Sequence, residues 1–211
     1  KHKNKDVKID SNQLKKCESS TVQGIISESA ENIIAVISRT SKIYANFLEG
    51  LSTQNSDLLK KSKKGVAKLD SEIEDLRDNI FFLIKNLDET SVRGSNFYII
   101  ILAYLTDIAQ SLEFISRKSY KHVNNQHQKL KFNQFKDLKE IEDRLDLLYK
   151  EIIDIFNSRK FERISFVIAQ KKELIGLISV KIDTQIERTR SEESSPKNTT
   201  LYFNILLETK D

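Results

Sequence analysis

Turn-forming residues are scarce in this chain, and their scarcity limits the folds open to it. The 211 residues include five Gly and one Pro. A chain with many strands needs such residues at short intervals for its turns. Apolar residues instead recur three and four apart over long stretches, which is the spacing of one face of an α-helix. We therefore predict an all-α fold, an antiparallel bundle of about six helices joined by few loops.

Six stretches carry these apolar lines, approximately residues 20–51, 58–87, 96–118, 135–156, 161–186 and 196–211. Polar connections separate them, the longer ones at residues 88–95, 121–131 and 188–195. Ser195 precedes Pro196, a pair typical of a cap and first helical position, so it predicts the start of the sixth helix. The third stretch is the most apolar, and its predicted core line is Phe97, Ile101, Tyr104, Leu105, Ile108, Leu112 and Ile115.

The predicted domain organisation is simple. Residues 1–19 form a polar leader rich in Lys, which is either a terminus without fixed structure or a basic segment close to anionic lipid headgroups. Residues 20–211 contain no Gly-, Pro- or Ser-rich linker, so we expect one helical domain. Its sixth apolar line is still regular at Asp211, and we expect the last helix to be truncated there.

Composition excludes several classes of protein. The net charge is only +4, from 35 basic and 31 acidic residues, which argues against a dedicated nucleic-acid-binding face. The longest apolar run, Phe97 to Leu105, has nine residues, whereas a membrane-spanning helix needs roughly 20. We therefore expect no segment of this chain to span a bilayer. Cys17 is the only cysteine, so no intramolecular disulfide can form.

Catalytic signatures are missing from the sequence. It contains no zinc-protease HExxH, CxxC, glycine-rich phosphate loop or GxSxG. His122 and His127 lie five residues apart, roughly 140° around a helix, so one metal ion would not contact both. We expect both to lie in the polar connection, while His2 lies in the leader. Cys17 has no recognisable histidine partner, and we predict that the chain is not an enzyme.

Carboxylates provide the only metal-site candidates. Asp70, Glu74 and Asp78 fall four residues apart, which places them on one face of the second helix. Such a column binds a divalent cation only if another helix adds oxygen ligands, and otherwise it is a solvated face. Asp107 lies beside the predicted core line of the third helix, either at a helix seam or turned outwards. Glu74, Asp78 and Asp107 are the candidates that we retain.

Two segments of the chain are similar to each other. Residues 96–107 align with residues 200–211, and the alignment pairs Tyr98 with Tyr202, Ile101 with Ile205, Leu102 with Leu206, and Asp107 with Asp211. The same offset pairs Glu89 with Glu193. Two alternatives remain, a duplicated three-helix unit or a chance similarity between two core helices.

Three segments of the chain are similar to one protein family. They are DLRDNIFFLIKNLDE (75–89), FYIIILAYLTDIAQSLEFISRKSYKHVNNQH (97–127) and SSPKNTTLYFNILLETKD (194–211). They resemble the PhoU-like cytoplasmic C-terminal domain of bacterial inorganic phosphate transporters. The resemblance covers the chain from about residue 20 onwards and implies two three-helix repeats.

Members of this family characteristically carry Glu/Asp-x-x-x-Asp motifs on the third helix of each repeat, which can hold metal clusters. The resemblance places Asp107 at the first acidic position, but Ser111 occupies the second. Glu74 and Asp78 keep the spacing on the second helix, whereas their repeat counterparts, Ile178 and Ile182, cannot bind a metal. The resemblance therefore implies degraded metal sites, no required cofactor and a doubtful divalent cation.

The resemblance also implies a function. The chain is expected to be a regulatory or accessory domain of a phosphate permease, on the cytoplasmic face of the bacterial inner membrane. Its partners would be the transmembrane permease portion of the same polypeptide and, as a homodimer, a second copy, with no nucleic acid. The alternative is a structural helical scaffold or dimerisation module without a ligand.

Overall fold

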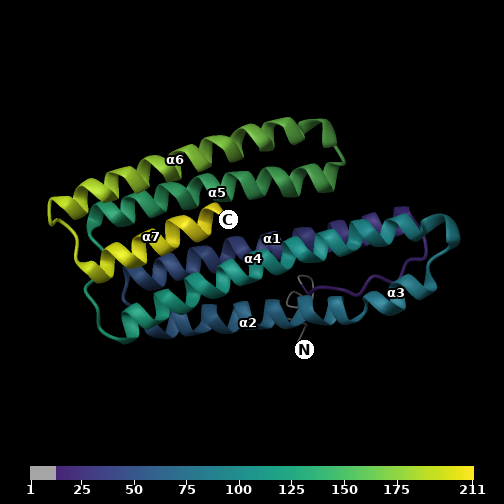
Figure 1. Ribbon diagram of the computed structural model, residues 1–211, viewed down its shortest axis with the longest axis horizontal. Coiled ribbons are helices and arrows are strands. Elements are labelled where there is room, and N and C mark those ends of the chain that lie inside the picture. The colour runs from purple at the N-terminus through teal and green to yellow at the C-terminus, as the bar shows by residue number, and fades with distance from the viewer. Residues whose placement is uncertain (1–12) are drawn as a thin grey trace, which may run out of the picture. The chain divides into compact units, whose positions relative to one another are not determined.

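The computed structural model describes residues 13–211, and within that range the chain forms helices and no strands. The elements are α1 (Val22–Ser52), α2 (Ser56–Asp78), α3 (Ile80–Asn86), α4 (Val92–Asn124), α5 (Phe132–Ser158), α6 (Ile164–Arg190) and α7 (Pro196–Lys210), with 3₁₀ turns η3 (Glu89–Ser91) and η4 (Phe161–Arg163) (Figure 1). The short α3 follows α2 directly, so the fold comprises six packed helices. The all-α prediction is confirmed.

The helix ends match the predicted signals in part. The Ser195 hydroxyl accepts a hydrogen bond from the Asn198 backbone N–H at 3.2 Å, so the predicted cap of the last helix is confirmed. Two predicted connections are shorter than expected. The helical conformation resumes at Glu89, and α4 continues to Asn124 before the connection begins.

Three helices end in the same way. The chain turns into the left-handed conformation at Gln54, Gln126 and Glu192, with φ of 55–56°. After α4, the His127 N–H donates to the His122 carbonyl and the Gln126 N–H to the Val123 carbonyl. This hydrogen-bond pair defines the Schellman motif, which normally has glycine at its left-handed position.

The described chain divides into two compact units. The first contains the described part of Lys1–Thr40 together with Lys68–Ala109, and the second contains Ser41–Ala67 and Gln110–Asp211. In the first unit α4 buries Tyr98, Leu102, Leu105 and Ala109, and other core residues come from α1 and α2, including Ile25, Val36, Leu69, Ile73 and Leu76.

The buried line of α4 differs from the predicted one. Phe97 and Tyr104, predicted to lie in the core, are 40% and 61% exposed, whereas Tyr98 and Leu102 are buried. The apolar run from Phe97 to Leu105 is the cause, because it offers more than one line of apolar side chains at helical spacing.

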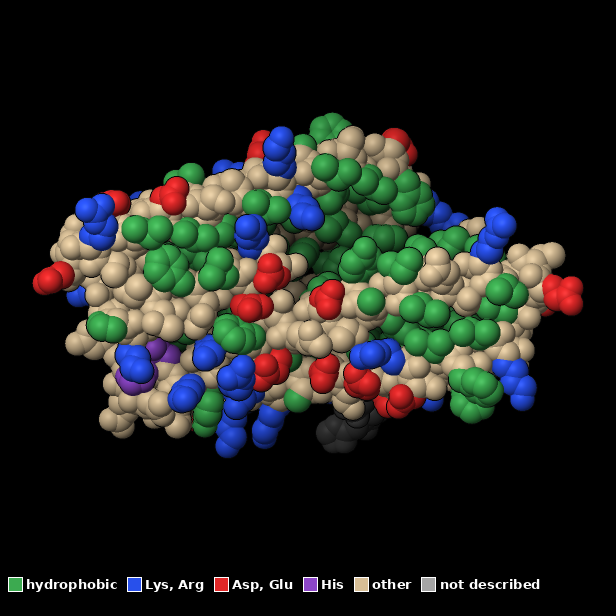
Figure 2. Space-filling model, viewed as in Figure 1, with side chains coloured by type: hydrophobic (Ala, Val, Ile, Leu, Met, Phe, Trp, Pro, Cys, Tyr) green, Lys and Arg blue, Asp and Glu red, His purple; other side chains and the backbone are tan. Residues whose placement is uncertain are grey.

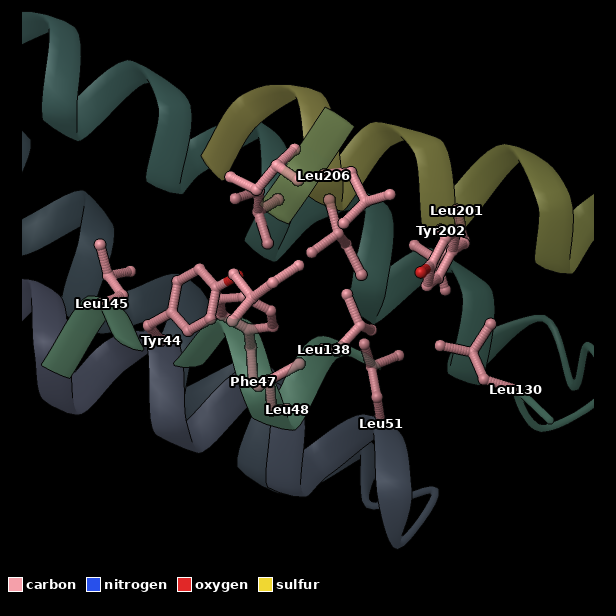
Figure 3. Packing of buried hydrophobic residues seen from close by; sticks show 14 of the residues in the cluster. Tyr44, Phe47, Leu48, Leu51, Leu130, Leu138, Leu145, Leu201, Tyr202 and Leu206 are labelled. Atoms are coloured by element: carbon pink, nitrogen blue, oxygen red, sulfur yellow. The ribbon is translucent and has the colours of Figure 1, made fainter. Parts of the chain in front are cut away.

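The second unit contains an extensive apolar cluster. Figure 3 shows Tyr44, Phe47 and Leu51 from α1 beside side chains from α5 and α7, with Leu138, Leu145, Leu201, Tyr202 and Leu206 among them. The hydroxyls of Tyr44 and Thr209 lie 2.8 Å apart and join α1 to α7. Consecutive helices α5, α6 and α7 run antiparallel (Figure 1).

Candidate functional site

The most elaborate polar site of the second unit surrounds Asp137, near the start of α5. Its Oδ2 accepts hydrogen bonds from the Arg188 guanidinium of α6 and the Tyr202 hydroxyl of α7, both at 2.9 Å. The Lys181 ammonium of α6 lies 3.0 Å from Oδ1 and 2.7 Å from Glu140. We call Asp137, Glu140, Lys181, Arg188 and Tyr202 the Asp137 cluster. It joins all three C-terminal helices.

The electrostatics of this cluster keep its acid and base ionised. Burial raises the pKa of Asp137, but the hydrogen bonds from Lys181, Tyr202 and Arg188 outweigh burial, and the pKa lies below its ordinary value. Burial lowers the pKa of Lys181, yet Glu140 and Asp137 more than compensate and raise it. Burial and the charge of Asp137 raise the pKa of Tyr202. These shifts move the pKa values of Asp137, Lys181 and Tyr202 away from neutral pH, so the three groups are suited to holding helices together and poorly suited to acid–base catalysis.

A small polar cavity lies next to the cluster. Its volume is about 290 Å³ and its lining comprises Lys131, Asn133, Gln134, Arg188, Glu193 and Ser194. Gln134 is 1% exposed, and its amide nitrogen donates to Gln185 and to the Ser194 hydroxyl, each at 3.1 Å. Its amide oxygen accepts from the Lys131 N–H at 2.9 Å. The cavity offers cationic and hydroxyl donors and one carboxylate, which suit a small polar ligand.

The predicted metal candidates lie on exposed parts of the helices. Glu74 forms an ion pair with Arg77 at 3.0 Å, and both side chains are about half exposed. Asp78 at the end of α2 and Asp107 on α4 are also exposed. Within residues 13–211, no group of three or more His, Cys, Asp or Glu side chains is placed to hold a metal ion.

The histidines differ from their predicted setting. His122 belongs to α4 and is buried, so its predicted place in the connection is wrong, whereas His127 does lie there. Their rings are 5.2 Å apart because the chain reverses at Gln126. The His122 Nε2 lies 2.9 Å from the Gln128 carbonyl, and burial chiefly lowers its pKa. His2 lies outside the described residues.

Cys17 is buried in the segment before α1. Its thiol donates to the Glu28 carboxylate at 2.6 Å. Burial, together with Glu28, raises the pKa of Cys17 to about 12. The thiol is therefore protonated at neutral pH, which is the opposite of an activated nucleophile.

Exposed apolar side chains form the other notable surfaces. In the first unit they lie on α3 and the first half of α4, and the largest are Phe81, Phe82, Phe97, Ile100 and Tyr104. In the second unit they lie mainly on η4 and α6, namely Phe161, Ile164, Phe166, Ile168, Val180 and Ile186. Figure 2 shows apolar side chains over the end of α6 next to the α5–α6 connection.

One helical stretch, Glu89–Asn124, is long and apolar enough to cross a membrane by length and composition. Only 33% of its most apolar window is buried. Core helices of soluble proteins share this length and composition, so the stretch by itself does not identify a membrane span. The nine-residue apolar run predicted that no segment could span a bilayer, but the helix as a whole has the length and composition of a span.

Gln134, Asp137 and Gln185 were not among the site residues predicted from the sequence. Their signal was present, because these polar residues fall in register with the buried lines Leu138–Ile141–Leu145 of α5 and Leu174–Ile178 of α6. A polar residue on a core line is seldom buried unless it has partners.

Comparison of the chain with models of protein families, with curated proteins and with solved structures gives no match. The candidate site therefore rests on its own geometry.

Proposed function

We propose that this chain is a non-catalytic regulatory or accessory domain of an inorganic phosphate permease, with a PhoU-like arrangement of two three-helix repeats. The observation that carries the proposal is the paired burial of Tyr98 and Tyr202. These residues match in the internal repeat, lie on α4 and α7, and are 1% and 0% exposed. Their repeat-related neighbours Leu102 and Leu206 are also buried, at 2% and 0%.

The proposed repeats are α1, α2 with α3, and α4, followed by α5, α6 and α7. In each repeat the third helix places a tyrosine and, four residues later, a leucine in a core. If the similarity arose by chance, the matching residues need not be buried to the same degree. If the unit was duplicated, they should occupy equivalent buried positions. This correspondence supports duplication and, with it, the family resemblance.

The proposed mechanism is conformational. The exposed aromatic side chains of α3 and α4 offer a surface for the transmembrane portion of the same polypeptide at the cytoplasmic face of the bacterial inner membrane. A partner or ligand that binds two conformations of the transporter differently shifts the equilibrium between them. The mechanism needs no metal, cofactor, nucleic acid or chemical step.

The decisive experiment is to sequence the gene upstream of Lys1 and then measure phosphate uptake. We expect several apolar segments of about 20 residues each, the length that spans a bilayer. Cells expressing the complete product should take up labelled phosphate at a rate that changes when residues 20–211 are deleted. A gene product without upstream membrane segments, or an uptake rate that the deletion leaves unchanged, would refute the proposal.

A helical scaffold that dimerises is the second candidate. The exposed apolar side chains of α6 favour it, because a surface helix normally keeps one polar face. Sedimentation equilibrium of the purified protein tests this candidate. A strict monomer at high protein concentration would rule out the scaffold, whereas a dimer together with unchanged phosphate uptake would favour it.

A further inference from the structure

The side of α5 turned away from the core carries an open hollow of about 660 Å³, and the residues that line it all belong to α5. Phe132, Lys136, Asp143 and Leu147 are among them. At 3.6 residues per turn, these four side chains fall within about 60° of the helix circumference. They therefore form one line, which we call the α5 stripe. The buried Ile141 lies on roughly the opposite side of the helix.

The α5 stripe is exposed although half of it is apolar. Phe132 is 79% exposed and Leu147 is 60% exposed. Within residues 13–211 no ion pair involves Lys136, and Asp143 pairs with Lys139 of the same helix at 3.3 Å on the exposed surface. The stripe thus has an apolar side chain at each end and, between them, one basic and one acidic side chain that no other helix contacts.

The order of residues along the α5 stripe is self-complementary. Phe132 precedes Lys136 by four residues and Leu147 follows Asp143 by four, so the two pairs share one midpoint. When two copies of a helix pack antiparallel about a two-fold axis at this midpoint, residues equally far from it lie level with each other. Lys136 of each copy then meets Asp143 of the other. Phe132 likewise meets Leu147 at each end of the contact.

The charges at the midpoint do not oppose such a pairing. They belong to Lys139 and Glu140, which lie on opposite flanks of the stripe, so each would approach its own counterpart in the second copy. Lys139 already forms ion pairs with Glu142 and Asp143, at 3.2 and 3.3 Å. Glu140 already pairs with Lys181 at 2.7 Å. Both charges are therefore neutralised within their own chain.

We propose that the α5 stripe binds a second copy of this chain, with the two α5 helices antiparallel about a two-fold axis. The charge pattern selects this occupant, because a two-fold interface uses the same patch on both copies and must be complementary to itself. A parallel pair would instead place Lys136 beside Lys136 and Asp143 beside Asp143. The inference does not depend on the proposed role in phosphate transport, since its test measures only the association of the purified chain.

Charge reversal tests the pairing, with sedimentation equilibrium as the measurement. Lys136→Asp brings two carboxylates together at both symmetric sites, and Asp143→Lys brings two ammonium groups together. Each substitution changes both sites from attraction to repulsion, so the dissociation constant of the dimer should rise about tenfold or more. The control Lys172→Asp should leave it unchanged, because Lys172 is exposed on α6 roughly 180° around the helix from Lys181, which contacts α5.

Combining the two reversals gives the sharper test. A heterodimer of the K136D and D143K proteins has opposite charges at both sites, as does a homodimer of the double variant K136D/D143K. We expect the mixture and the double variant to dimerise with a dissociation constant close to that of the wild type. If K136D and D143K each abolish the dimer but neither combination restores it, the antiparallel pairing is refuted.

The apolar ends distinguish this surface from the exposed apolar side chains of α6. Phe132→Ala should raise the dissociation constant about tenfold or more, whereas Phe166→Ala, at a position 64% exposed on α6, should not. A dimer that F166A dissociates and K136D does not would overturn the proposal. So would a wild-type chain that stays monomeric at high concentration, which would leave the stripe to a different partner.

Urea denaturation at protein concentrations below the dissociation constant is the control for folding. All of these substitutions replace exposed side chains, so the stability of the isolated protomer should be nearly the same in every variant. Loss of the dimer then reports the contact itself.

Discussion

Residues other than glycine adopt the left-handed backbone conformation at several helix ends, which lowers the local stability of this chain. Gln54, Gln126, Arg159 and Glu192 have φ of 55–57°, whereas no glycine of the described chain has positive φ. The left-handed conformation costs an L-residue roughly 1–2 kcal/mol. The few glycines of the sequence are therefore not used at the helix ends, where they normally occur.

Replacing Gln126 with Gly should stabilise the protein. The Gln126→Gly substitution relieves the left-handed strain, and we expect a gain of about 0.5–1 kcal/mol in the free energy of unfolding. Gln110→Gly, at an exposed position inside the same helix, should instead lose about 1 kcal/mol. Urea denaturation measures both, and the same sign for the two substitutions would contradict the explanation.

Asp137 is the residue whose loss should cost most among the polar groups. Asp137→Asn leaves Lys181 and Arg188 largely buried beside a neutral amide, and their side chains are only 16% and 17% exposed. Removing one member of a buried ion pair costs roughly 3–5 kcal/mol. We expect a loss near the lower end, because Lys181 retains Glu140. Asp143→Asn on the exposed face of α5 removes the same charge and should change stability by less than about 0.5 kcal/mol.

The same cluster predicts a pH dependence. The pKa of Asp137 is lower in the folded than in the unfolded chain. Its stabilisation is therefore complete above the titration range of a free aspartate, near pH 3.9, and is lost as the pH falls through the folded value. The difference in denaturation midpoint between wild type and D137N should shrink on acidification below about pH 4. A constant difference down to about pH 3 would contradict this assignment.

At the scale of the element, α4 shows how far the sequence determines a helix. Its existence and type could be predicted from long apolar periodicity, but its rotation could not. Ile99, Ile100, Ile101 and Leu102 are consecutive, so every face of that turn is apolar, and only tertiary packing selects Leu102 for burial. The candidate site shows the same limit, because Asp137 meets Lys181 and Tyr202 only through the arrangement of three helices.

Two substitutions in α4 measure its rotation directly. Leu102→Ala should lower the free energy of unfolding by about 2–5 kcal/mol, because Leu102 is 2% exposed and its removal leaves a cavity. Ile100→Ala, at 43% exposure, should cost less than about 1 kcal/mol. Similar losses at both positions would mean that α4 is rotated from the described orientation.

At the scale of the whole molecule, the composition does not predict where exposed apolar surface lies. The sequence contains enough apolar residues for a core, but it does not state which of them remain exposed. Phe82 is 59% exposed and its neighbour Leu83 is 4% exposed. Large exposed apolar patches are typical of interaction sites, and the contact proposed above between α3 and the permease uses these side chains.

Substitutions of Phe82 and Leu83 can distinguish an effect on partner contact from an effect on folding stability. Phe82→Ser should leave stability within about 0.5 kcal/mol but alter phosphate uptake by the full-length product if α3 contacts the permease. Leu83→Ser should lower stability by about 2–4 kcal/mol, because it buries a hydroxyl and opens a cavity. Denaturation and uptake assays on both variants give the test. An F82S protein with unchanged uptake would remove α3 from the proposed contact.

Chemical labelling of the buried Cys17 thiol can measure local opening of the first unit. A thiol with a pKa of about 12, held by Glu28, is almost unreactive toward alkylating reagents while the first unit is closed. Reagent consumption then follows the opening of the segment around Cys17, through the opening rate when the reagent acts faster than the segment recloses and through the open population when it acts more slowly. Since the chain has no other cysteine, each labelled molecule gains the mass of one reagent group, and mass spectrometry can follow the opening without an engineered label.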